Sequence, residues 1–200
     1  MTPAARIYRS TESRRQEIVD AAIHTLATHG YAATSFARIM ETAGLSSTRM
    51  ISYHFADKAA LMGAIVESVI RDAGAVMVPA MEAESTIRGK LAAYIHSNLV
   101  FLLEHREAAR AVIEVISNAP RQDNGIREDT SAVLLSLLLA QGQEAGDFRA
   151  FDTAVVARSI RATIDAFAVH MPERYGTARA AIDEIVALYH RATKQEGLTS

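Results

Sequence analysis

The sequence predicts an all-α protein with a small N-terminal head and a larger helical body. Apolar residues recur at every third or fourth position through most of the 200 residues, which is the spacing of helices with one buried face. Helix-ending residues such as Gly30, Gly44 and Pro172 punctuate this pattern. Because 50% of the residues are apolar, the chain can bury a substantial core.

The head contains two short helices followed by the start of a longer one, between Thr34 and Ile65. Either Thr34 or Ser35 can cap the first helix, and Gly44 ends it because glycine accepts the left-handed conformation of a sharp helix exit. Ser46 is the predicted N-cap of the second helix, which we expect to bury Met50. Two short helices joined at a glycine are typical of a helix-turn-helix.

The second helix is rich in side chains that bind DNA. Hydroxyls, a guanidinium and a phenol are groups that pair with phosphates and base edges. We therefore predict that this helix enters the major groove, with contacts from Ser46, Ser47, Thr48, Arg49, Ser52 and Tyr53.

The head resembles that of the TetR family of transcriptional regulators. The resemblance covers roughly the first third of the chain and rests on Gly30-Tyr31, Thr34-Ser35, Ile39, Ala43-Gly44-Leu45-Ser46, Tyr53-His54-Phe55, Lys58 and Leu61. The chain departs from the commonest motif by one extra residue between Gly44 and Phe55, and by Ser47-Thr48-Arg49 in place of a basic-glycine pair.

This resemblance implies further DNA contacts. Tyr53 and His54 would touch the DNA backbone, and Lys58, behind a capping Asp57, would reach a phosphate. Thr34 and Ser35 complete the predicted DNA-binding set. The alternative is that Tyr53 and Phe55 are core aromatics and Lys58 is a solvated charge; for Phe55 we expect the core position.

Composition argues against several other classes. The chain has no cysteine, which excludes disulfides and thiolate metal sites, and its longest apolar run is far shorter than the roughly 20 residues of a membrane span. Residues 1–58 hold seven Lys/Arg and five Asp/Glu, so the head has a net charge of +2 and the rest −4. We find no HExxH and no nucleophile elbow, and expect a cytoplasmic protein without catalytic residues, metal or cofactor.

We divide the chain into residues 1–58, the N-terminal tail and DNA-binding domain, and residues 59–200, the effector and dimerisation domain. Met1 to Ser10 should be disordered, with Arg6 and Arg9 as candidate DNA contacts. The remaining helices are expected at Ser13–His29, Asp57–Val78 stopped by Pro79, Ser85–Arg106, Glu107–Asn118, Glu128–Glu144, Asp152–Val169 and Thr177–Lys194.

The body is expected to hold a ligand pocket and a dimer interface. The resemblance implies a four-helix interface formed by the last two helices of each subunit, with Val156, Ile160, Ile164, Phe167, Ile182, Ile185, Val186 and Tyr189. It also implies a small-molecule pocket, for which plausible lining residues are Met81, Tyr94, Asn98, Phe101, Leu102, Glu114 and Leu137. Alternatively these residues are simply core.

The expected function is a TetR-like regulator, a repressor that binds palindromic operator DNA as a homodimer and is released by a small-molecule effector. It has no membrane partner. The alternative is a helical carrier or enzyme whose N-terminal helices are only structural. A third possibility is a DNA-binding protein without a small effector.

Overall fold

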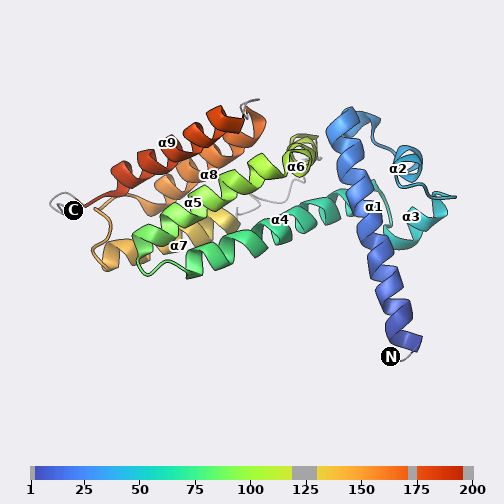
Figure 1. The fold of residues 1–200 in the computed structure, drawn as a ribbon, viewed down its shortest axis with the longest axis horizontal. Coiled ribbons are helices and arrows are strands. Elements are labelled where there is room, and N and C mark those ends of the chain that lie inside the picture. The colour runs from blue at the N-terminus through green and yellow to red at the C-terminus, as the bar shows by residue number, and fades with distance from the viewer. Residues whose placement is uncertain (1–2, 119–129, 171–174, 196–200) are drawn as a thin grey trace. The chain divides into compact units, whose positions relative to one another are not determined.

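The computed structural model describes residues 3–118, 130–170 and 175–195, which are helical apart from short connections (Figure 1). This confirms the predicted all-α class. In the described ranges the helices are α1 Pro3–Ala33, α2 Phe36–Thr42, α3 Arg49–His54, α4 Lys58–Glu82, α5 Ile87–Glu104, α6 Arg106–Asn118, α7 Thr130–Glu144, α8 Thr153–Val169 and α9 Tyr175–Thr193.

The chain forms two compact units, which we call the head unit and the body unit. The head unit comprises Met1–Asp72 and Arg106–Arg121, and thus includes the first part of α4 and all of α6. The body unit comprises Ala73–His105 and Gln122–Ser200. The head unit therefore extends beyond the predicted boundary at residue 58 and takes in a helix that lies much later in the sequence.

The core of the head unit is formed where α1 packs against α2 and α6. Helix α6 has a buried side because small and branched apolar residues recur on one face, and Ala111 and Val115 reach this core. The other fully buried large residues of the unit come from α1 to α4, namely Ile18, Val19, Leu26, Ile39, Ile51, Leu61 and Ile65. The two short helices are thus packed on a scaffold of longer ones.

Helix α1 is longer than the sequence suggested. We expected disorder through Ser10, but the helix begins at Pro3, where a proline costs little because the first turn has no hydrogen-bonded N–H to lose. Residues 1 and 2 lie outside the described residues. Gly30 has φ 76° and ψ 170°, so the regular helix ends there as predicted and a single turn follows.

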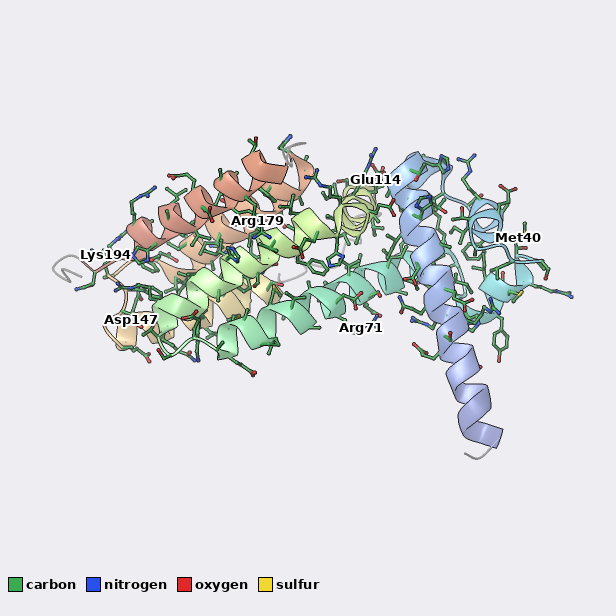
Figure 2. All side chains as sticks on the ribbon, in the orientation of Figure 1. Met40, Arg71, Glu114, Asp147, Arg179 and Lys194 are labelled. Atoms are coloured by element: carbon green, nitrogen blue, oxygen red, sulfur yellow. The ribbon has the colours of Figure 1, made fainter. Side chains whose placement is uncertain are left out.

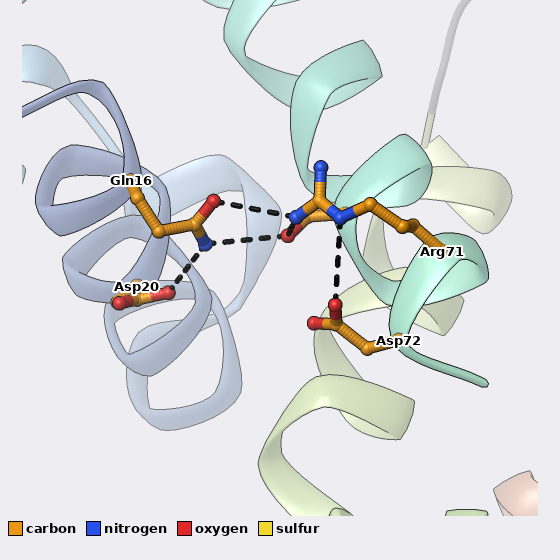
Figure 3. Close-up of polar contacts among 5 residues, drawn as sticks. Gln16, Asp20, Arg71 and Asp72 are labelled. Carbon is orange, nitrogen blue, oxygen red and sulfur yellow. Dashed lines mark hydrogen bonds and ion pairs between the residues drawn. The ribbon is translucent and has the colours of Figure 1, made fainter. Parts of the chain in front are cut away.

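A polar cluster joins α1 to the first part of α4 (Figure 3). Arg71 Nη2 donates to Ser68 Oγ at 2.8 Å and to Gln16 Oε1 at 3.3 Å, and Gln16 Nε2 donates to Asp20 Oδ1 at 2.9 Å and to Ser68 Oγ at 3.3 Å. Arg71 Nε also lies 3.5 Å from Asp72 Oδ1. Because the Ser68 hydroxyl is buried and has these partners, the cluster fixes the rotation of the two helices about their axes.

The body unit is built around α5, which packs against α7, α8 and α9. Its core contains apolar residues from all four helices, including Leu91, Ile95 and Leu99 of α5, Leu139 of α7 and Ile160 of α8. Phe148, in the loop after α7, is buried against Gly142, where a Cβ would lie 2.2 Å from the Phe148 ring. The isolated bridge between Phe148 and Lys194 closes this end of the unit.

Hydrogen bonds at helix starts explain where the body helices begin. The predicted cap Asp152 accepts from Val155 N at 3.0 Å. For α5 the cap is Thr86 rather than Ser85, since Thr86 Oγ1 accepts from Gly89 N at 3.0 Å. Asp147 Oδ2 also accepts from Ile87 N at 3.1 Å, so the first turn of α5 has two side-chain acceptors.

Neither Pro79 nor Thr177 marks a helix boundary as predicted. Pro79 does not stop α4, which continues to Glu82; the ring removes one backbone hydrogen bond, and only one further turn follows it. Thr177 does not cap α9, because the helix already begins at Tyr175. The predicted start of α7 at Glu128 and the helix-ending Pro172 lie outside the described residues.

Within the described ranges, none of the helices combines the length and the continuous apolar character that crossing a membrane would require.

Candidate nucleic-acid interface

Helix α2 ends in a tight turn at Gly44. Ser35 caps the start of the helix by accepting from Arg38 N at 3.3 Å. At the other end Gly44 has φ 62°, and Leu45 N donates back to Met40 O at 2.9 Å. This left-handed exit turns the chain so that Leu45 packs against the core of the head unit.

Helix α3 begins later than predicted. Ser46 does not cap it; the helix starts at Arg49, and Ser47 Oγ accepts from Arg49 N at 3.1 Å. Ser46 Oγ instead lies 3.9 Å from Met50 Sδ. Residues 43–48 therefore form the connection between α2 and α3.

Ile51, and not Met50, anchors α3 in the core. Ile51 is completely buried, whereas Met50 is only half-buried. Both residues are apolar and adjacent, so local apolar spacing could not distinguish between them. A helix of six residues has little stability of its own, so α3 depends on this one side chain and on Phe55, which follows it.

Phe55 is a core residue, as expected. It is 3% exposed, and the Arg15 guanidinium of α1 lies 5.0 Å from the centre of its ring. The contact secures the end of α3 against α1.

The side of α3 away from the core carries the polar side chains that were predicted to bind DNA. Arg49, Ser52 and Tyr53 are exposed, and Tyr53 keeps 79% of its surface accessible. The exposed Tyr53 excludes the alternative that it is a core aromatic. Its ring meets the His54 ring edge to face at 5.1 Å between centroids, which orders two side chains predicted to contact the DNA backbone.

Thr34 does not fit its predicted role. It is 2% exposed, and its hydroxyl donates to Gly30 O at 2.8 Å. The side chain therefore stabilises the turn after α1 and is not available to DNA. Its neighbour Ser35 is exposed and remains a candidate.

Lys58 has an internal partner that the sequence did not reveal. Its Nζ donates to Tyr31 O at 2.7 Å and lies 4.0 Å from the centre of the Tyr31 ring. Desolvation by burial lowers the pKa of Lys58. Because an ammonium has three N–H donors, one can bind the carbonyl while another reaches a phosphate, so the predicted contact stays a prediction. Asp57 caps the helix as expected, accepting from Ala60 N at 2.8 Å.

The residues predicted to line a ligand pocket are not brought together as a set. Glu114 lies in the head unit, where its Oε2 accepts from Tyr31 N at 2.8 Å, so its assignment to the pocket is wrong. On α7, Leu137 is 56% exposed. On α5, Phe101 and Asn98 are buried, and Asn98 Nδ2 donates to Tyr94 O of its own helix at 3.0 Å. Met81, Tyr94 and Leu102 are half-buried.

A surface hollow of about 380 Å³ lies elsewhere on the body unit. It is lined by residues of α5 and α9, none of which was in the predicted set: His96, Asp183, Val186, Ala187, His190 and Arg191. No group of three or more metal-binding side chains occurs among the described residues.

The predicted dimer residues divide into two groups. Ile160, Ile164, Phe167, Ile182 and Tyr189 are buried within the single chain, so for these five the prediction of an interface role is wrong. Helices α8 and α9 have apolar residues on more than one face, and their spacing alone cannot tell which face packs on the protein's own core. Val156, Ile185 and Val186 remain half-buried.

Instead, α8 exposes a different stripe. Its members follow one another at alternating intervals of four and three residues and are small or apolar: Val155, Ser159, Ala162, Ala166 and Val169. Val155 and Val169 are each 55% exposed, and Leu188 on α9 is 49% exposed. A seam with this 3.5-residue spacing is the pattern by which one helix packs on another.

The head unit thus combines a glycine turn with a short helix that is anchored by one apolar residue and presents polar side chains outward, which defines a helix-turn-helix protein. Residues 18–65 match the sequence profile described as "Bacterial regulatory proteins, tetR family". The match covers the helix-turn-helix region of the head unit, which is therefore similar to the N-terminal domain of this family.

Known proteins are similar to this chain in the sequence of the head or in fold. Over 61 residues the chain is 36% identical to the HTH-type transcriptional regulator BetI of Paraburkholderia phytofirmans, a match that spans 30% of this chain and 31% of that protein. A tetR-family regulatory protein from Rhodococcus RHA1 has the same fold, with a TM-score of 0.75 and 23% identity over 90% of this chain and 97% of that one. AibR, solved with isovaleryl coenzyme A and operator DNA, aligns with a TM-score of 0.73 and 17% identity over 88% and 97% of the two chains.

Proposed function

We propose that this protein is a cytoplasmic transcriptional regulator, a repressor rather than an enzyme, which binds palindromic operator DNA as a homodimer. The observation that carries this proposal is the outward polar face of α3, anchored by the buried Ile51. Arg49, Ser52 and Tyr53 offer a guanidinium, a hydroxyl and a phenol to a duplex, and the helix is short enough to enter a major groove end-on. Residues 1–58 hold this function in our proposal.

Homodimerisation through α8 and α9 completes the recognition of DNA. One six-residue helix contacts too few base pairs for specific binding, whereas a two-fold pair reads two half-sites. The exposed seam from Val155 to Val169 supports this mode of pairing because its small residues let two helices approach closely, and Leu188 of α9 is exposed as well. The half-buried Val156, Ile185 and Val186 lie at its edge in our proposal.

Release by a small-molecule effector in residues 59–200 is the third part of the proposal. It is supported by the shared fold with AibR, which was solved with both an acyl coenzyme A and operator DNA. An effector weakens DNA binding if it binds more tightly to a conformation in which the two α3 helices do not fit one duplex. The loss equals the difference in its affinity for the two conformations, typically about 1 to 3 kcal/mol.

Fluorescence anisotropy with the duplex that flanks the coding region tests the proposal. We expect saturable binding. The logarithm of the association constant should fall linearly with the logarithm of the salt concentration, because Lys and Arg side chains displace counterions from the phosphates. Absence of saturable, salt-sensitive binding would favour a helical carrier or enzyme with a purely structural head.

Arg49→Ala should relax sequence preference at one base position. The exposed guanidinium at the start of α3 can form two hydrogen bonds to a guanine, so its loss should cost about 1 to 3 kcal/mol for the preferred base and little for the others. Binding to a set of single-base variants of the operator measures this difference. A uniform loss over all variants would contradict base reading by Arg49.

Lys58→Ala should weaken DNA binding without changing the sequence preference, in contrast to Arg49→Ala. Removal of a phosphate contact weakens binding to every duplex and reduces the salt slope by about one. Because Lys58 also binds Tyr31 O, an unfolding curve for the same variant must accompany the titration. An unchanged slope would mean that Lys58 acts only inside the head unit.

A further inference from the structure

The turn from Gly30 to Thr34, at the end of α1 and called here the turn after α1 because the regular helix ends at Gly30, is held by hydrogen bonds from three directions. Tyr31 O accepts from Lys58 Nζ, the first residue of α4, and also from Thr34 N at 3.2 Å. Gly30 O accepts from the Thr34 hydroxyl. The remaining donor, Tyr31 N–H, cannot bond within a regular helix because Gly30 breaks it, and Glu114 Oε2 accepts it at 2.8 Å.

Glu114 lies directly against this turn (Figure 2). A Cβ at Gly30 would lie 3.3 Å from Glu114 Oε2, so the absence of a side chain there makes room for the carboxylate. Gly30 also has a positive φ, which glycine adopts without strain. The turn is therefore shaped both for its own backbone conformation and for the carboxylate that it receives.

The turn is linked to both sides of the helix-turn-helix. Thr34 and Ser35 lead from it into α2, and Ser35 is the N-cap of that helix. Lys58, the first residue of α4, binds it from the other side. Tyr31 is therefore connected both to the start of α2 and to the start of the helix that follows α3.

Glu114 is the contribution of α6 to this arrangement. Helix α6 is the part of the head unit that comes from the later sequence, and it directly follows α5 of the body unit along the chain. We propose that Glu114 is a positioning residue for DNA recognition, through which α6 fixes the turn that orients α2 and α3. This inference rests on the proposed DNA-binding function.

Glu114→Ala tests the proposal, with Glu107→Ala as the matched control. Glu107 is also a glutamate of α6 that contacts α1, since its Oε2 lies 3.2 Å from His24 Nδ1, but its side chain is 62% exposed and does not touch the turn. We expect Glu114→Ala to bind the flanking duplex about tenfold more weakly, as suits the loss of a hydrogen bond to a charged group, with an unchanged salt slope. Glu107→Ala should bind like the wild type.

Two further measurements separate positioning from general loss of stability. In the DNA-free protein, hydrogen exchange at the Tyr31 amide should accelerate at least about tenfold in Glu114→Ala and stay unchanged in Glu107→Ala. Glu114→Gln keeps an acceptor for Tyr31 N–H and should recover affinity to within about threefold of wild type.

The outcomes distinguish the positioning role of Glu114 from the proposed DNA-binding function. Wild-type affinity in Glu114→Ala, beside a wild-type chain that binds the duplex, would overturn the positioning role. A wild-type chain that binds no duplex would instead refute the proposed function. Equal losses of DNA affinity in Glu114→Ala and Glu107→Ala would also overturn the positioning role of Glu114, because they would reflect only the attachment of α6 to α1.

Discussion

Ala162→Glu should convert the protein into a monomer and abolish tight operator binding. Ala162 is exposed at the middle of the α8 seam, between Ser159 and Ala166. In a two-fold interface each substitution occurs twice, so the variant crowds two bulky side chains of like charge into a contact between small residues. Burial of such charges costs about 3 kcal/mol or more, which raises the dimer dissociation constant at least about 100-fold.

Sedimentation equilibrium measures the oligomeric state, and anisotropy measures the accompanying loss of operator affinity. The matched control is Ala75→Glu, which adds the same side chain at an exposed alanine within α4 and should leave both quantities unchanged. If Ala162→Glu remains dimeric and binds the operator as before, the seam is not the interface.

Ile51→Ala should weaken the fold of the head unit and DNA binding together. Ile51 is completely buried and is the one buried residue of the six-residue α3. Truncation of a buried isoleucine removes its packing and leaves a cavity, at a cost of about 2 to 5 kcal/mol. A helix this short does not persist without tertiary contacts, so the exposed face should lose its order along with the anchor.

Ile51→Val provides the control for this second expectation. It shortens the side chain by one methylene group and should cost only about 0.5 to 1.5 kcal/mol. Denaturant unfolding and hydrogen exchange of the α3 amides measure the effect on the fold, and operator titration measures the effect on binding. If Ile51→Ala and Ile51→Val behave alike in all three, α3 does not depend on this residue.

Local sequence signals predicted the features that are set by local physics. Gly30 and Gly44 have the positive φ values expected of helix exits. Asp152 and Asp57 cap the helices that follow them, because a carboxylate beside free N–H groups acts over three residues. The motif around Gly44 and Phe55 was therefore enough to locate the helix-turn-helix, and the long buried stripes were enough to give the all-α class.

Features set by distant contacts escaped prediction. Glu114 looked like a polar group in an apolar pocket, yet its partner is a backbone N–H 83 positions earlier in the sequence. Lys58 looked free for a phosphate, yet a carbonyl of the turn after α1 binds it. No periodicity encodes which backbone groups are left without a helical partner, so neither contact had a signal in the sequence.

The prediction of which residues of α8 form the dimer interface was wrong for a related reason. Ile160 and Ile164 belong to the stripe that packs on α5, whereas Ala162 and Ala166 belong to the exposed seam. The bulkier residues were predicted to form the interface because they give the stronger apolar signal. In the fold they fill the chain's own core, and the smaller residues remain exposed.

Selection of duplexes from a random DNA library by the wild-type protein tests the central claim most directly, which is that two copies of α3 read one duplex together. We predict enrichment of a palindrome whose half-sites are separated by about one helical turn or a multiple of it. Arg49→Ala should lose the preference at one symmetry-related pair of positions. Enrichment of no sequence, or of a single site without two-fold symmetry, would contradict the account.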